Sequence, residues 1–440
     1  MGTDTRESQQ RIKGPLVTGL AGMGVDVLDG GVLPTAAISY LIASDPALSG
    51  GVMISASHNP VFENGIKVFD RRGMKIKDDD EQTIEENFLA PDGLASNAPM
   101  AGHVLTDKSL EQRYVQGLID EFKYVSWRGD KLLVDCAQGA TYRVAQSVLG
   151  KLGLHYQLQN TSPDGTNINQ EAGSEQVRKA PRDFADEIRS SRAELGIAFD
   201  GDADRVVFVD REGILYDGDL LLAILAHELQ AEKRLKGNTV VITQMANSGL
   251  AEHLGKFGIQ TKVVHNGDKY ITDMLVEHDL ALGGEQIGHL IVHTDSRHVT
   301  GDGLRTALWV LSYLAKHPGM SLRDLTQGMR KWPQVNISVH LGEKHLEGKK
   351  KIAGLAELLA CLQEEIKDIS RLECRPASTE PVYRIMLEAR ETSLETLTDV
   401  ACGIALHIQK TLGVAGEPVD ILDCVSGGRI PPSSVPCFRE

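Results

Sequence analysis

Short apolar runs alternate with helical patterns from the N-terminus to about residue 320. The apolar runs at 131–135, 195–199 and 239–243 have the length of buried strands, and segments with helical spacing stand between them. This alternation predicts an α/β fold, in which helices cover mixed sheets. From residue 334 the order changes to strand, helix, two strands and helix. That order is typical of a small α+β domain, with helices on one face of an antiparallel sheet.

The same order divides the chain into four domains and a tail. The first three are expected to be similar α/β domains, the fourth is the α+β domain, and their loops are expected to face one cleft. The predicted ranges are 1–104, 105–213, 214–320 and 321–412. Residues 413–440 are expected to form a disordered tail.

The charge balance and the cysteines exclude several classes of protein. The chain holds 61 Asp and Glu against 46 Lys and Arg, a net charge of −15, so no binding to nucleic acid or to an anionic membrane is expected. Six scattered cysteines without a Cys-x-x-Cys pair favour free thiols in a reducing compartment over a zinc site. No apolar run is long enough to cross a bilayer, and a cytoplasmic protein is therefore expected.

An apolar run at 52–54 ends in the small polar segment Ser55-Ala56-Ser57-His58-Asn59-Pro60. A buried strand of this kind delivers polar residues to the carboxyl edge of a sheet, where ligands bind in open α/β folds. Ser57, which has no bulky neighbours, can act there as a nucleophile or carry a phosphoryl group. The same residue types are ordinary in turns, so the loop alone leaves both interpretations open.

Three carboxylates follow the apolar run at 195–199, in Asp200-Gly201-Asp202-Ala203-Asp204. Carboxylates this close repel one another and need a positive partner. An EF-hand loop is excluded because its sixth position requires Gly and its twelfth Glu, whereas this chain has Arg205 and Arg211. A solvated acidic turn fits poorly between two apolar runs. Such oxygen ligands suit Mg²⁺, which could share an oxygen of a phosphate on Ser57.

Two later loops carry polar and charged residues that could bind a ligand. In Gly283-Gly284-Glu285-Gln286-Ile287-Gly288-His289, the glutamate can accept bonds from sugar hydroxyls or from an amine, and the histidine can donate to a substrate or move a proton. In Arg375-Pro376-Ala377-Ser378-Thr379-Glu380-Pro381, the arginine can hold a phosphate bidentately, while backbone N–H groups and the threonine complete the site.

These motifs, in this order, resemble those of the α-D-phosphohexomutase family, most closely its phosphoglucosamine mutases, from Gly2 to about residue 412. The resemblance implies an isomerase that interconverts glucosamine 6-phosphate and glucosamine 1-phosphate. In the implied mechanism, phospho-Ser57 gives its phosphoryl group to the sugar, the resulting hexose bisphosphate turns around, and the other phosphate returns to Ser57. The implied cofactors are Mg²⁺ and the bisphosphate as activator. The implied partner is a small phosphosugar, and the protein is expected as a monomer or homodimer.

The resemblance also implies roles for individual residues. Lys67 matches a lysine of the family in Asn64-Gly65-Ile66-Lys67, although a lysine at a strand edge is more often merely solvated. The implied catalytic residues are Ser57, His58, Lys67, Arg205 and His289. The implied substrate-binding residues are Glu285, His289, Lys269, Arg375, Ser378, Thr379 and Arg384. The implied metal ligands are Ser57, Asp200, Asp202 and Asp204.

Two loops depart from the family pattern. Ile287 stands where the family has a serine, which removes a hydrogen bond to the sugar. In the phosphate loop Ala377 lacks the family's hydroxyl, and Ser378 replaces a glycine. Phosphomannomutase or phosphoglucomutase activity therefore remains an alternative, as does a non-catalytic relative that binds a phosphosugar.

The N-terminal region departs as well. No strand is predicted before the first helix, at 8–24, and the βαβ unit that precedes it in the family, with an arginine-bearing loop, is not found. The apolar stripe of that helix has no predicted sheet to cover it; it consists of Ile12, Leu16, Leu20 and Met23. We expect a form extended at its N-terminus to be more stable and more active.

Overall fold

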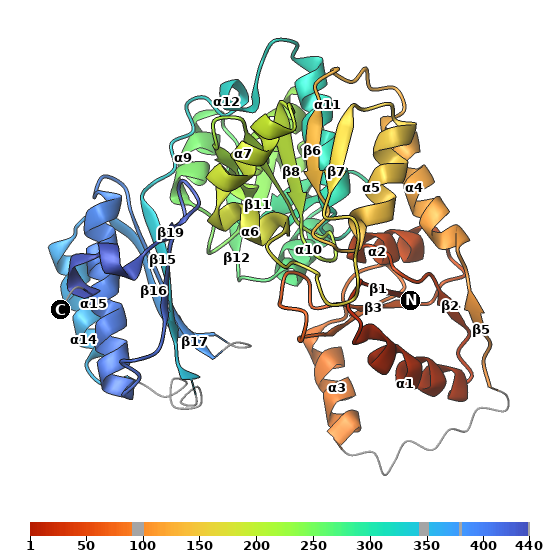
Figure 1. The fold of residues 1–440 in the computed structure, drawn as a ribbon, viewed down its shortest axis with the longest axis horizontal. Coiled ribbons are helices and arrows are strands. Elements are labelled where there is room, and N and C mark those ends of the chain that lie inside the picture. The colour runs from red at the N-terminus through yellow and green to blue at the C-terminus, as the bar shows by residue number, and fades with distance from the viewer. Residues whose placement is uncertain (90–100, 343–351, 378–380, 439–440) are drawn as a thin grey trace. The chain divides into compact units, whose positions relative to one another are not determined.

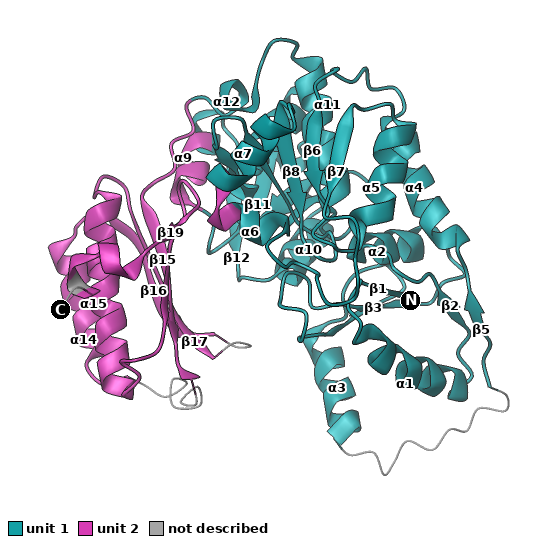
Figure 2. Ribbon diagram, viewed as in Figure 1, with its two compact units in different colours: residues 1–177, 182–246, 254–327 teal, residues 178–181, 247–253, 328–440 magenta. Residues whose placement is uncertain are grey.

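The computed structural model describes residues 1–89, 101–342, 352–377 and 381–438 (Figure 1). These residues form two compact units (Figure 2). Unit 1 comprises residues 1–177, 182–246 and 254–327, and unit 2 comprises residues 178–181, 247–253 and 328–440. No helix among the described residues is long and apolar enough to cross a membrane.

The first part of unit 1 holds a three-stranded sheet in the order β1-β3-β4, formed by β1 (Gly2–Thr3), β3 (Gly51–Ile54) and β4 (Ile66–Phe69). β1 runs parallel to β3, and β4 antiparallel to it. The expectation that no strand precedes the first helix was wrong. Gly2 and Thr3 pair with Met53 and Ile54, a partner too distant in the sequence for a two-residue strand to be recognised.

Helices accompany this sheet. They are α1 (Gln9–Gly22), α2 (Thr35–Ser44) and α3 (Asp78–Leu89). α2 buries Ala37, Ile38 and Leu41, whereas α1 has no fully buried residue. β2 (Val27–Asp29) and β5 (Val104–Thr106) form a separate parallel pair. β5 spans the first predicted domain boundary, and we propose that this boundary lies after residue 106.

The second sheet of unit 1 has the order β10-β9-β8-β6-β7. β7, β6 and β8 are parallel, and β9 and β10 continue the sheet antiparallel. β6 and β8 are buried along their whole length, which explains their uninterrupted apolar sequences. The strands are β6 (Leu132–Asp135), β7 (Tyr156–Gln159), β8 (Leu195–Phe199), β9 (Val206–Asp210) and β10 (Leu215–Tyr216). The helices are α4 (Ser109–Phe122), α5 (Thr141–Lys151), α6 (Gly173–Lys179) and α7 (Pro181–Ser190).

The third sheet has the order β12-β11-β13-β14, and only β14 is antiparallel. Its strands are β11 (Thr239–Thr243), β12 (Gln260–Val264), β13 (Leu282–Gly284) and β14 (Leu290–Val292). Aspartates cap two helices of this region, since Asp217 accepts from the Leu220 N–H and Asp302 from the Arg305 N–H. The helices are α8 (Gly218–Ala231), α9 (Ser248–Lys256), α10 (Asp268–Glu277), α11 (Gly303–Lys316) and α12 (Leu322–Leu325).

Unit 2 holds an antiparallel sheet in the order β16-β17-β15-β18-β19, with helices α14 (Leu355–Glu365) and α15 (Leu394–Leu412) on one face (Figure 1). The strands are β15 (Gln334–His340), β16 (Ile369–Pro376), β17 (Val382–Ala389), β18 (Val419–Asp423) and β19 (Arg429–Ile430). The predicted fold class, α/β domains with mixed sheets followed by an α+β domain, is confirmed.

The prediction of a disordered tail at 413–440 was wrong for its described residues. β18 pairs with β15 over five residues and places Ile421, 1% exposed, in the core of unit 2. Val414 and Val435 join the same core. The segment is short and rich in Pro and Gly, so its alternating pattern is weak without the neighbouring strand that stabilises it.

Candidate active site

Ser57 lies just beyond the carboxyl end of β3 and is buried. Its backbone is left-handed, with φ of 50°, which is uncommon for a residue other than glycine. Its hydroxyl donates a hydrogen bond to Asp200 Oδ2 at 2.5 Å. The predicted nucleophile therefore faces the first residue of the predicted metal loop.

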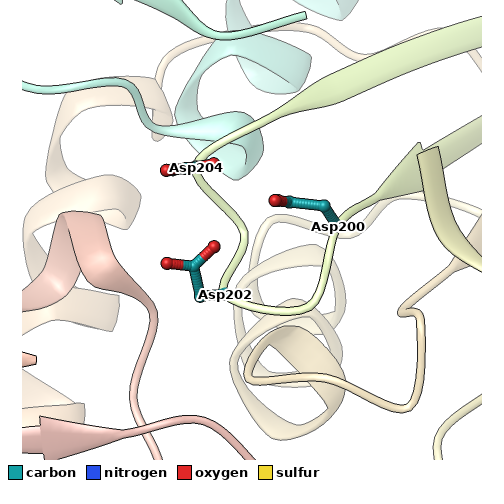
Figure 3. Close-up of side chains that lie close together, drawn as sticks. All are labelled: Asp200, Asp202 and Asp204. Atoms are coloured by element: carbon teal, nitrogen blue, oxygen red, sulfur yellow. The ribbon is translucent and has the colours of Figure 1, made fainter. Parts of the chain in front are cut away.

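The three aspartates lie on the loop between β8 and β9, and each can direct a carboxylate oxygen to within 4.8 Å of the other two (Figure 3). All three are buried. Gly201 allows this loop to approach Ser57, since a β-carbon on Gly201 would lie 2.6 Å from the Ser57 carbonyl oxygen. Among the residues described, Asp202 Oδ1 and Asp204 Oδ1 are buried without a hydrogen-bond partner. Buried carboxylate oxygens that accept no hydrogen bond fit a divalent cation such as Mg²⁺.

Lys67, on β4, supplies positive charge to this cluster. Its ammonium lies 2.5 Å from Asp202 Oδ2 and 3.3 Å from Asp204 Oδ2. Burial would lower the pKa of Lys67, but the two aspartates outweigh burial and raise it. Lys67 is therefore a cation in the site rather than a solvated strand-edge lysine.

The pKa values of Asp200 and Asp204 are shifted in opposite directions. Burial, followed by the charges of Asp204 and Asp202, raises the pKa of Asp200 well above its usual range. Burial would also raise the pKa of Asp204, but Lys67 and His289 outweigh it and hold that pKa well below the usual range. The cluster thus limits its own negative charge, as repulsion between close carboxylates requires.

Arg205 and His58 lie beside the same loops. The Arg205 guanidinium is 2.9 Å from His58 Nδ1, and its backbone N–H donates to Asp200 Oδ1 at 3.1 Å. Arg205 Nε lies 3.8 Å from Asp204 Oδ1. The guanidinium is thus directed along the edge of the carboxylate cluster, toward the residue after Ser57.

The loop between β13 and β14 brings His289 and Glu285 to the site. His289 Nδ1 lies 3.6 Å from Asp204, and its Nε2 accepts a hydrogen bond from the Gly301 N–H at 3.1 Å. Glu285 accepts from the Gly267 N–H at 3.3 Å, and burial raises its pKa. Gly288 is required in this turn: its φ is 96°, and a β-carbon there would lie 2.3 Å from the Val206 carbonyl oxygen.

Three other predicted site residues belong to α10, β16 and β17. Lys269 pairs with the acidic first turn of α3, through Asp78 and through Glu81 at 3.3 Å. Arg375 and Arg384 belong to unit 2, where they are directly opposite each other on β16 and β17. Ser378 and Thr379 lie outside the described residues.

Several residues of the site were not predicted. Thr35 donates its hydroxyl to Asp202, and Asp268 lies between Lys75 and His289, 3.7 Å from His289 Nε2. The salt bridge to Lys75 is the main interaction that outweighs burial and lowers the pKa of Asp268 to about 2. A further group contacts the Ser57 loop and consists of Asp4, Arg6 and Asn169. The Asp-Thr-Arg motif at 4–6 was visible in the sequence, but its partners were not.

Models of phosphoglucomutase/phosphomannomutase α/β/α domains I, II and III match residues 1–93, 112–213 and 217–332 of the chain. Among curated proteins, a phosphoglucosamine mutase of Caldicellulosiruptor bescii is 38% identical over 395 residues, which cover 89% of this chain and 86% of that protein. One from Desulforudis audaxviator is 39% identical over 399 residues, covering 90% and 86%.

Solved structures share the fold. A phosphoglucomutase/phosphomannomutase family protein of Burkholderia thailandensis has a TM-score of 0.74 at 23% identity and covers 95% of this chain and 90% of its own. The N-acetylphosphoglucosamine mutase of Aspergillus fumigatus, solved in complex with GlcNAc-6P and magnesium, has a TM-score of 0.65 at 19% identity, covering 86% and 92%.

Proposed function

This chain belongs to the phosphoglucomutase/phosphomannomutase family, and from this premise we propose that it interconverts glucosamine 6-phosphate and glucosamine 1-phosphate. Its relatives at 36–39% identity over most of the chain are phosphoglucosamine mutases. The observation that carries the proposal is the contact of the buried Ser57 hydroxyl with Asp200, at the edge of three clustered carboxylates.

Ser57 is the proposed carrier of the phosphoryl group. A phosphoserine has a charge of about −1.5 to −2, and here it would be placed against buried aspartates. That arrangement requires cations, and Lys67 and Arg205 supply two of them from this chain. Phosphoryl transfer depends mainly on positioning and on charge stabilisation, which is what these side chains offer.

We assign the metal site to Asp200, Asp202 and Asp204, with the Ser57 phosphate as the fourth ligand. The two buried carboxylate oxygens that accept no hydrogen bond, Asp202 Oδ1 and Asp204 Oδ1, support this assignment. Mg²⁺ bound there would neutralise phosphate charge and polarise the phosphorus atom. Thr35, which donates to Asp202, holds that carboxylate in place.

Proton transfer is assigned to residues around the cluster. The raised pKa of Lys67 keeps its ammonium charged, so Lys67 is suited to neutralise a developing charge rather than to give up its proton. His289 has its Nε2 lone pair engaged by Gly301, which leaves the proton on Nδ1, facing Asp204. Glu285, whose charged form burial disfavours, is the proposed acceptor for sugar hydroxyls or the amine.

Phosphate recognition is proposed for unit 2. Two arginines directly opposite each other on antiparallel strands repel, and an anion bound by both would relieve that repulsion. Arg375 and Arg384 are therefore proposed to hold the unreactive phosphate, together with Ser378 and Thr379. The hexose bisphosphate is the proposed intermediate and activator.

A coupled assay tests the proposal. Purified protein is given Mg²⁺, a catalytic amount of glucose 1,6-bisphosphate, and glucosamine 6-phosphate, glucose 6-phosphate or mannose 6-phosphate in separate reactions. We expect the highest kcat/KM with the amino sugar, phosphate on Ser57 by peptide mapping, and no turnover in Ser57→Ala. Turnover in Ser57→Ala, or phosphate confined to Ser55, would exclude Ser57 as the carrier.

A second candidate is a phosphomannomutase or phosphoglucomutase. The observation in its favour is Ile287, which is half-buried in the β13–β14 loop and cannot form a hydrogen bond to the sugar. Higher kcat/KM with mannose 6-phosphate or glucose 6-phosphate in the same assay would select this candidate.

A further inference from the structure

The backbone of Ser57 is held on both sides by side chains that do not touch its hydroxyl. The left-handed φ of 50° is unfavourable for serine and persists only where surrounding contacts impose it. On the carbonyl side, the Ser57 oxygen accepts from Asn169 Nδ2 at 2.8 Å and from Arg6 Nη2 at 3.4 Å. On the amide side, the Ser57 N–H donates to Ser55 Oγ at 2.9 Å.

Arg6 is the most unusual of these residues because its side chain is fully buried. Its Nη1 pairs with Asp4, and its Nη2 also reaches the carbonyl oxygens of Asn59 and of Pro60, the latter at 3.5 Å. Asn169 reaches Asn59 as well, at 3.3 Å. Burying a guanidinium costs free energy, which its hydrogen bonds must offset. The three carbonyl contacts of Arg6 in one loop therefore indicate that Arg6 fixes the backbone of that loop.

Asp4 connects the contacts on the amide side of Ser57 with those on its carbonyl side. The carboxylate that pairs with Arg6 also accepts the Ser55 hydroxyl at 2.7 Å, and Ser55 in turn accepts the Ser57 N–H. The peptide groups on both sides of Ser57 are therefore hydrogen-bonded to the Asp4–Arg6 pair, one directly to Arg6 and the other through Ser55. Two fixed peptide planes determine the direction of the Ser57 Cα–Cβ bond, and from there the hydroxyl oxygen reaches Asp200 Oδ2 at 2.5 Å.

We propose that Asp4, Arg6 and Asn169 are positioning residues, which hold the loop 55–60 so that the oxygen of Ser57 faces the carboxylate cluster. This inference rests on the proposed role of Ser57 as the phosphoryl carrier. Arg6 and Asn169 act on the main chain of the loop and not on the transferred group. Their loss should therefore lower turnover more than substrate affinity.

Asn169→Gly tests the proposal, because glycine removes the amide and tolerates the left-handed backbone of residue 169, whose φ is 59°. Asn160→Gly is a matched control, because Asn160 has φ of 53° and donates its amide N–H to Asp135, at 2.9 Å, rather than to the Ser57 loop. We expect kcat to fall about 10–100-fold in Asn169→Gly, with KM within about twofold, and no comparable change in Asn160→Gly. Asn169→Asp, which keeps the shape but removes both N–H donors, should lose turnover similarly.

Hydrogen exchange supplies a readout that does not depend on activity. Peptides covering residues 55–60 should exchange faster in Asn169→Gly than in the parent protein, and not in Asn160→Gly. If the parent protein lacks mutase activity, the proposed function fails, whereas the exchange experiment still decides the positioning role. Unchanged exchange in Asn169→Gly, or an equal fall of kcat in the two glycine variants, would overturn the inference.

Discussion

Ser57 and Asp200 are 143 residues apart in the chain and 2.5 Å apart in the structure. At the scale of single residues, the site depends on a few close approaches of this kind. Gly201 and Gly288 stand where a side chain would strike a backbone carbonyl, and Lys67 supplies the charge that three aspartates need. Side-chain chemistry could be read from the motifs, because each motif carries its own donors and acceptors.

Asp202→Asn should weaken Mg²⁺ binding while keeping the fold. The substitution removes one charge from the proposed metal ligands at nearly constant shape, so affinity should fall by at least the roughly 10–100-fold typical of a lost supporting group. Isothermal titration calorimetry with Mg²⁺, beside circular dichroism, measures both properties. Unchanged affinity in the variant would remove Asp202 from the metal site.

Gly288→Ala should destabilise the protein and impair the β13–β14 loop. The added carbon would meet the Val206 carbonyl oxygen at 2.3 Å, in addition to the strain of a positive φ. Gly319→Ala is the control, since φ is 87° there but the space around it is open. Urea denaturation should show a loss of about 1 kcal/mol for the control and clearly more for Gly288→Ala. Equal losses would show that the close contact is relieved at no cost.

At the scale of elements, Arg305 provides a buried link between α11 and α4. Arg305 forms a bidentate pair with Glu121, with both N–O distances at 2.7 Å, and also donates to the Val292 carbonyl oxygen at 2.6 Å. Burial would raise the pKa of Glu121, but Arg305 outweighs it and lowers that pKa. Because the carboxyl of the folded protein has the lower pKa, the pair stabilises the fold above the unfolded pKa of about 4.3.

Glu121→Gln should therefore lower stability at neutral pH by about 2 kcal/mol. The difference from the parent protein should shrink as the pH falls through the folded pKa, because Glu121 then takes up a proton in both states. Urea denaturation between pH 3 and pH 7 measures this difference. The control is Glu111→Gln, which breaks a pair with the exposed Arg143 at 2.8 Å and should cost less than ~1 kcal/mol. A difference independent of pH would assign the effect of Glu121 to packing.

At the scale of the whole molecule, the chain forms two compact units, and the C-terminal residues complete the second one. β18 is an inner strand of the five-stranded sheet, between β15 and β19. Without it, β15 would present an unpaired edge, and the core would lose Val414, Ile421 and Val435.

Removal of residues 413–440 should therefore unfold unit 2 while unit 1 keeps its structure. We expect calorimetry to show two transitions in the full chain, of which one disappears in the shortened chain. Limited proteolysis should then cleave within residues 328–412 and spare the part of unit 1 before residue 246. A shortened chain with the parent's melting profile would show that β18 contributes little.

The sequence by itself determined the local structure: which segments are strands or helices, and which polar loops end them. Buried strands such as β8 can be recognised by their length and their apolar residues. The carboxylate spacing at 200–204 limits the possible chemistry of that loop, whatever surrounds it. Only the tertiary structure decided the partners. Thr35, Arg6 and Asp268 joined the site because packing brought them to Asp202, to the Ser57 loop and to His289, and a two-residue strand at Gly2–Thr3 exists only beside β3. Short strands and buried ion pairs derive their stability from neighbours distant in the chain, so no local pattern records them.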